Sequence, residues 1–359
     1  MADVPPLNNS SLPPWAAYLA QAGHQAPSAD NSQPWRFHWN PEVMTLRVSR
    51  VDEGLGANHP AVLMALGAVL ENIVQAALAA GIDPTSWQFI APSEGQLDVL
   101  CIPQPPSDFP TNQNLPSSIT QRYTNRNAYF KTPLPDDVIK EITSLSEGDV
   151  KTVVIQDRSS IDQIVNVVSL ASEARFQTEE IHRWFAQSLR FTEQEVAVGD
   201  GLDVATLCLP PGGKLLLNVT KNWSTMNFLN RVGGHKLFAK VEGSGLRNCG
   251  AIVAFASSAA TKEAWLAAGR LLQRVWLLLA SRDFAAQPYF VLSDQLHRLT
   301  TNQVPADLRD QVEKIEKQVK TLPAIEQQTL FMLLRIGRAK AKAVRSRRFS
   351  LDAVTSFSP

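Results

Sequence analysis

The stretch APSADNSQPWRF, residues 26–37, is the most informative part of this chain for its fold and its function. Pro27 and Pro34 stiffen the stretch because each proline fixes its own φ. Three polar side chains lie between them: Ser28, Asn31 and Gln33. Such a loop can hold fixed hydrogen bonds to a flat heterocycle, and a plain turn leading into a strand is the alternative.

The residues around this loop predict a first part made of a hairpin, a buried helix and two short strands. Residues 35–39 and 43–48 alternate like a hairpin, and 59–80 form a helix that is apolar nearly all round. Residues 87–91 and 97–102 are strand-like. We expect the aromatic side chains of this hairpin to lie in the core rather than to stack on bases; they are Trp35, Phe37 and Trp39.

The rest of the chain predicts a similar but longer second part. The expected helices span residues 136–146, 159–185, 262–282 and 307–334, the last one broken near Pro323. The expected strands span residues 150–155 and 251–256. Five prolines between residues 103 and 116 predict a linker, which divides the chain into halves of residues 1–118, with an N-terminal arm, and 119–359.

The two long apolar helices can be aligned with each other. LGAVLENIVQAALAAGI begins at Leu66 and AGRLLQRVWLLLASRDF begins at Ala268, so that Gly67 matches Gly269. Two helices that are apolar on every side need mutual burial. The alignment therefore suggests that they pack together at the centre of a pseudo-symmetric pair.

The composition indicates an ordered protein without an overall charge. Lys and Arg number 34, as do Asp and Glu, so net charge gives no reason to expect nucleic acid or an anionic membrane; either would need a local basic patch. Three separate cysteines and the lack of a secretory signal predict a cytoplasmic location. No His or Cys spacing predicts a metal site, and no P-loop, GxGxxG or GxSxG motif is present.

Two segments are rich in arginine. In QRYTNRNAYF, residues 121–130, Arg122 and Arg126 flank Thr124, a combination suited to a phosphate, with a solvated domain start as the alternative. LLRIGRAKAKAVRSRRFSLDAV, residues 333–354, is a basic surface tail, a phosphate clamp or a nucleic-acid patch. The apolar Leu351 and Val354 favour docking of this segment onto the body of the protein.

These segments together resemble the nitroreductase family of flavoproteins. That family carries an RxSxR-like segment, a PSxxNxQPW loop, a GAxxxNxxxAA core helix and a C-terminal RR segment, and this chain has each in an order similar to the Acg-like branch, where two halves are fused. The resemblance implies an α+β, nitroreductase-like fold of two fused pseudo-symmetric halves, with central buried helices and flanking mixed or antiparallel sheets. It covers roughly residues 15–354.

The resemblance also implies a site. Family members are usually dimers with flavin mononucleotide (FMN) between subunits, and this chain has one loop and one set of basic segments. It therefore implies one FMN per chain in a pseudo-dimeric monomer, with further homodimerisation open. The implied cofactor-binding residues are Pro27, Ser28, Ala29, Asn31 and Gln33 for the ring, Arg122, Thr124, Asn125, Arg126, Arg347 and Arg348 for the phosphate and ribityl chain, and Gln287, Pro288 and Tyr289 near the reactive nitrogen.

The expected activity is two-electron reduction of a nitro compound, quinone or similar small-molecule acceptor, with NAD(P)H as the donor. The flavin would carry the chemistry, so no catalytic side chain is named. Residues 175–248 are longer than the simple family pattern needs, and their Gly-rich PPGGK and NRVGGHK turns suggest a mobile lid. The alternative is thus a non-catalytic protein that sequesters FMN under this lid; we expect neither nucleic acid nor a membrane as partner.

Overall fold

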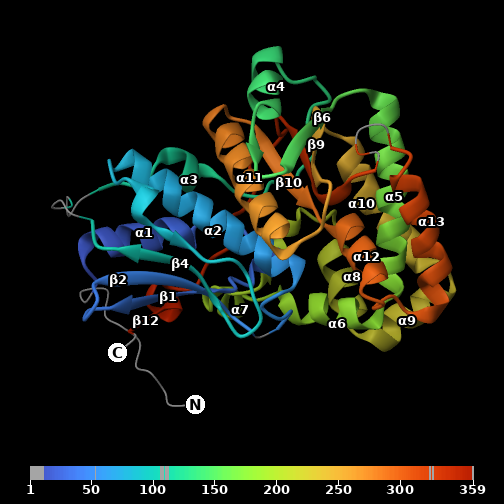
Figure 1. Cartoon of the computed structure of the whole chain (residues 1–359). Coiled ribbons are helices and arrows are strands. Elements are labelled where there is room, and N and C mark those ends of the chain that lie inside the picture. Colours follow the sequence, from blue (N-terminus) through green and yellow to red (C-terminus); the bar gives the residue numbers. More distant parts are fainter. Residues whose placement is uncertain are drawn as a thin grey trace.

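The computed structural model describes residues 12–52, 54–105, 109, 113–322, 325 and 327–357 (Figure 1). The first eleven residues of the expected arm, Pro106 and Pro110 of the expected linker, and Pro323 lie outside these ranges. Two five-stranded sheets flank a central pair of helices, with a further helical layer over the second sheet.

The first sheet has the strand order β12-β1-β2-β4-β3. The strands are β1 (Trp35–Asn40), β2 (Thr45–Arg50), β3 (Gln88–Phe89), β4 (Asp98–Pro103) and β12 (Thr355–Phe357). β1 and β2 form the expected antiparallel hairpin, and Trp35, Phe37 and Trp39 are buried in the core as expected. β12, from the C-terminal end of the chain, pairs in parallel with β1 and makes this sheet mixed.

Three helices belong to this part of the fold: α1 (Pro14–His24), α2 (Pro60–Ala79) and α3 (Ser117–Gln121). α2 begins where the sequence predicts, because Pro60 fits the first helical position and the His59 ring accepts a hydrogen bond from the Ala61 N–H. α1, α2 and the inner face of the sheet share one hydrophobic core.

The second sheet is antiparallel throughout and has the order β10-β11-β9-β6-β5. Its strands are β5 (Ser146–Glu147), β6 (Val150–Ile155), β9 (Ala251–Ser257), β10 (Ala285–Tyr289) and β11 (Thr329–Gly337). The prediction of helix up to residue 334 was wrong, because TLFMLLRIG is a central strand buried between β9 and β10. A short run of apolar residues has no period that separates a buried strand from a buried helix.

The helices of the second part are α4 (Asp136–Thr143), α5 (Arg158–Gln177), α6 (Glu179–Ser188), α7 (Glu193–Ala197), α8 (Gly213–Thr220), α9 (Trp223–Arg231), α10 (Gly234–Arg247), α11 (Lys262–Ser281), α12 (Val291–Thr300) and α13 (Arg309–Val319). α4 ends before the expected residue 146 because β5 begins there. The helix expected over 159–185 is two helices that meet at Thr178. Most of the insertion over residues 175–248 is helical; a short parallel pair, β7 (Leu189–Arg190) and β8 (Leu202–Asp203), completes it.

The two glycine-rich turns of the insertion start helices. Gly212 and Gly233 adopt φ values of 80° and 87°, and they cap the N-termini of α8 and α10. Such left-handed backbone favours glycine.

The two aligned glycines meet where α2 crosses α11 at the centre of the molecule (Figure 1). A Cβ atom on Gly67 would lie 2.0 Å from the Leu266 carbonyl oxygen, and one on Gly269 would lie 2.1 Å from the Met64 carbonyl oxygen. Backbones therefore touch without side chains between them. α2 is also long and apolar enough to cross a membrane, but 78% of its apolar window is buried inside the protein, as expected of a core helix.

Polar side chains beside this crossing pair in a two-fold pattern. Glu71 accepts two hydrogen bonds from Arg274, at 2.7 and 2.8 Å, and Asn72 accepts one from Gln273 at 2.6 Å. In the alignment of the two helices Glu71 matches Gln273 and Asn72 matches Arg274. Glu71 thus contacts the residue that matches Asn72, and Asn72 contacts the residue that matches Glu71. This is the contact pattern of a symmetric dimer interface.

We expect Gly269→Ala to lower the free energy of unfolding by at least about 2 kcal/mol, because the added methyl meets backbone rather than a flexible side chain. Chemical denaturation measures the change. Leu78→Ala on the exposed face of α2 is the control and should change stability by less than about 0.5 kcal/mol. Equal stability of the two variants would contradict the close helix contact.

Candidate functional site

The loop after α1 has a strained backbone. Asp30, Asn31 and Gln33 adopt φ values of 47°, 58° and 50°, a region that residues with a Cβ rarely occupy. The hydroxyl of Ser28 accepts a hydrogen bond from the Gln33 N–H at 3.0 Å and closes the loop on itself. Strain of this kind concentrates at binding sites, where surrounding contacts hold it in place.

The C-terminal segment supplies those contacts. Asn31 Nδ2 donates to the Arg347 carbonyl at 2.8 Å, and the Phe349 N–H donates to Gln33 Oε1 at 3.1 Å. The His24 ring bridges the Trp35 indole and the Phe349 carbonyl, at 3.2 and 2.8 Å. The loop from one end of the chain and the basic segment from the other therefore lie against each other.

Arg122 and Arg348 converge on the start of the same loop. Both donate to the Gln25 carbonyl, at 2.9 and 3.2 Å, and Arg122 lies over the Trp276 ring of α11. Arg345, which the sequence analysis did not single out, donates to the Thr120 carbonyl at 2.5 Å and stacks on Tyr123. We call Arg122, Arg345 and Arg348 the arginine cluster.

The arginine cluster carries positive charge without a paired acid. Among the described residues no carboxylate forms an ion pair with any of its three members. Burial, together with Arg348 and Arg345, lowers the pKa of Arg122, and burial together with Arg345 lowers the pKa of Arg348 to about 10. The buried atoms Arg122 Nε and Arg348 Nη1 have no hydrogen-bond partner among the residues that the structure describes. A bound anion would satisfy both the charge and these donors.

The other predicted arginines lie differently. Arg347 is exposed and contributes its carbonyl rather than a buried guanidinium. Arg126 points to the insertion, where it donates to Thr206 at 3.3 and 3.4 Å. Burial raises the pKa of Asp30, and the charges of Arg126 and Arg175 partly oppose this rise. Arg126 therefore interacts with the loop through the Asp30 carboxyl group.

Thr124 and Asn125 hold this segment to β10. Thr124 forms an isolated parallel β-bridge with Ala286, and the Asn125 N–H donates to the Ala286 carbonyl at 3.1 Å. The next residues of β10 are the predicted Gln287, Pro288 and Tyr289. Tyr289 reaches the insertion, donating to the Glu242 carbonyl of α10 at 3.4 Å.

The insertion covers the loop. The Gly199 carbonyl accepts hydrogen bonds from Asn31 Nδ2 at 3.3 Å and Gln33 Nε2 at 2.9 Å. Gly199 has φ 88°, and a Cβ there would lie 2.1 Å from the Arg348 carbonyl oxygen. The amide donors of Asn31 and Gln33 are thus both engaged by protein carbonyls, and Pro27 and Ala29 lie half-buried on the same loop.

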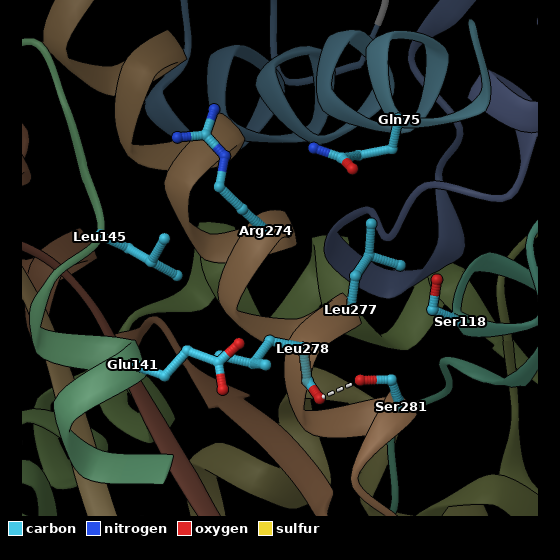
Figure 2. A pocket seen from close by; sticks show the side chains of 8 residues that line it. All are labelled: Gln75, Ser118, Glu141, Leu145, Arg274, Leu277, Leu278 and Ser281. Atoms are coloured by element: carbon cyan, nitrogen blue, oxygen red, sulfur yellow. Dashed lines mark hydrogen bonds between the residues drawn. The ribbon is translucent and has the colours of Figure 1, made fainter. Parts of the chain in front are cut away.

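Two cavities are lined by none of the predicted site residues. One of about 250 Å³ runs along α11 (Figure 2), and its lining residues are Gln75, Ser118, Glu141, Leu145, Arg274, Leu277, Leu278 and Ser281. The other, of about 370 Å³, is lined by Arg50, Asp52, Ala57, Asn58, Ser93, Glu94, Gly95 and Leu97. Among the described residues no cluster of three or more His, Cys, Asp or Glu could hold a metal ion.

No family model matches the chain. It is 21% identical over 291 residues to the uncharacterized protein MT1398 of Mycobacterium tuberculosis, covering 80% of this chain and 40% of that protein. Among solved structures, the FMN-dependent nitroreductase NfnB from Mycobacterium smegmatis in complex with NADPH aligns over 67% of this chain and 96% of its own, with 16% identity and a TM-score of 0.40. A nitroreductase with bound FMN from Bacteroides fragilis aligns over 65% and 93%, with 9% identity and a TM-score of 0.37.

We expect stability to fall as the pH drops from about 6.5 to 4, in part through His24. Burial lowers the pKa of His24 to about 4, so in this window the unfolded chain binds a proton that the folded chain excludes. The full shift corresponds to roughly 3 kcal/mol. Urea unfolding at pH 7 and pH 4.5 should show a smaller loss for His24→Gln than for the wild type; equal losses would contradict this role.

Proposed function

We propose that this chain is a flavoprotein oxidoreductase that binds one FMN and reduces a nitro compound, quinone or similar acceptor by two electrons, with NAD(P)H as donor. The observation that carries the proposal is the arginine cluster beside the strained polar loop: among the described residues its members have no carboxylate in an ion pair, and the buried Arg122 Nε and Arg348 Nη1 have no hydrogen-bond partner. A cytoplasmic location suits a nicotinamide donor. The Acg-like arrangement of two fused halves divided near residue 118, with a pseudo-dimeric monomer, belongs to the same proposal.

The residues of the site fit the parts of FMN. Arg122, Arg345 and Arg348 would hold the phosphate, because guanidinium groups bind phosphate oxygens through charge-assisted hydrogen bonds. The loop from Pro27 to Gln33 would border the ring, and the backbone of Gln287 to Tyr289 would lie near its reactive nitrogen. Thr124, Asn125 and Arg126 would line the ribityl side.

In this arrangement the cofactor and the protein would have separate roles. FMN, when bound, supplies hydride transfer. The side chains of this chain would bind and orient the cofactor, and the Gly199 carbonyl of the insertion holds the amides of Asn31 and Gln33 in place. The neutral Trp276 ring beneath Arg122 keeps that guanidinium in place without neutralising it.

We expect Arg348→Ala to weaken FMN binding tenfold or more, because it removes a charge-assisted contact to phosphate. Arg347→Ala, one residue away on the exposed side, is the matched control and should bind like the wild type. Quenching of flavin fluorescence measures both affinities. Riboflavin lacks the phosphate, so its affinity should be insensitive to either change; wild-type FMN affinity in Arg348→Ala would remove the phosphate role of the cluster.

A second candidate function is sequestration of FMN, and the Gly199 contacts favour it. The carbonyl of Gly199 accepts hydrogen bonds from the amides of Asn31 and Gln33, so the insertion rests directly on the loop that would border the ring.

Anaerobic stopped-flow mixing of the FMN-loaded protein with NADH and with NADPH separates the two candidates. We expect flavin absorbance to bleach with one donor and to return after addition of a nitroaromatic or a quinone. Flavin that remains oxidised with excess of both donors would assign the protein to sequestration instead.

A further inference from the structure

The outer surface of the insertion is unusually apolar. Half of the large hydrophobic side chains that are exposed among the described residues lie within residues 209–241: Leu209, Leu215, Leu216, Val219, Phe228, Val232, Leu237 and Val241. Single exposed hydrophobics are normal on a soluble protein, but a concentration of them marks an interaction surface.

The charged side chains in and just before this stretch are all positive. Residues 204–241 contain no Asp or Glu, and their cations are Lys214, Lys221, Arg231, Lys236 and Lys240, all of them exposed. Among the described residues none of these five forms an ion pair with a carboxylate. The neutral balance of the whole chain therefore conceals a local patch of positive charge.

Most of these residues lie on three consecutive helices, and Leu209, Lys221 and Val232 lie in the segments next to them. α8 packs against α9, and α9 against α10. α10 buries Ala239, Gly243 and Leu246, and it packs on α5. Its outer side carries Leu237 and Val241 next to Lys236 and Lys240, two pairs at helical i,i+4 spacing. We call the exposed side of α8, α9 and α10 the basic apolar face.

We propose that the basic apolar face binds the surface of an anionic lipid bilayer. Interfacial helices combine Lys and Arg with Phe, Leu and Val in this way: the apolar side chains enter the boundary of the acyl chains while the cations meet lipid phosphates. Lysine stems span the two environments, with the ammonium in water and the methylenes on apolar surface. This departs from our expectation that no membrane would be a partner, and it rests on a local basic patch, which the neutral net charge of the chain left open.

Two other occupants fit less well. A second copy of the chain would bring five cations against five cations without an acid to pair them. An acidic protein partner needs pockets for anchoring side chains, and neither cavity described above is lined by residues of these helices. A bilayer needs no pocket. The proposal is independent of the flavin.

Sedimentation of the full chain with vesicles tests the proposal. We expect binding to vesicles of phosphatidylglycerol and phosphatidylcholine at low salt, little binding to phosphatidylcholine alone, and a decrease as salt rises. Lys236→Glu with Lys240→Glu should weaken binding to the anionic vesicles tenfold or more. The matched control is Lys314→Glu with Lys317→Glu on α13, where both lysines are also exposed, and it should weaken binding far less.

A second pair of substitutions tests the apolar side chains of the basic apolar face. Phe228→Ser with Leu237→Ser should also weaken vesicle binding, whereas Val43→Ser with Leu78→Ser, exposed elsewhere, should not. Circular dichroism checks that each variant is folded. Failure of the wild type to bind anionic vesicles, or equal binding by the two lysine pairs, would overturn the proposal. So would a wild-type dimer that only the Phe228 and Leu237 changes dissociate, since that result would assign the face to self-association.

Discussion

Gly67 and Gly269 let two helix backbones touch, and this contact fixes how the two sheets stand relative to each other. Around it, Glu71 with Arg274 and Asn72 with Gln273 satisfy polar groups that would otherwise be buried alone. Because the glycines admit no larger side chain and the polar pairs admit no shift along the helix, the crossing has one register. The other contacts between the halves depend on the register of this crossing.

The candidate site is one of those contacts. The polar loop follows α1, which packs on α2, while Arg122 of the arginine cluster lies over Trp276 of α11. The central helices thus bring together residues that are distant in sequence. A change in the crossing would move the two sides of the site apart, so the stability of the core and the geometry of the site are linked.

Several features of this arrangement were predictable from residue patterns. Alternation in the first hairpin, the apolar character of α2 and α11 and the match of Gly67 with Gly269 each correspond to an observed element. The position of β11 was not predictable, since its apolar run fits either a strand or a helix. The basic C-terminal run also could not reveal that Arg348 turns inward while Arg345 and Arg347 remain exposed, because no period of a regular element orders that segment.

The contact between His24 and Phe349 joins residues that are 325 positions apart in the sequence. During synthesis Phe349 emerges from the ribosome 325 residues after His24. Until then α1, β1 and the strained loop lack the segment that covers them, so the nascent chain holds an unfinished edge at β1 where β12 later pairs. Closing a loop of this length costs more conformational entropy than forming a local contact, so the site depends on the long-range pairing of β1 with β12.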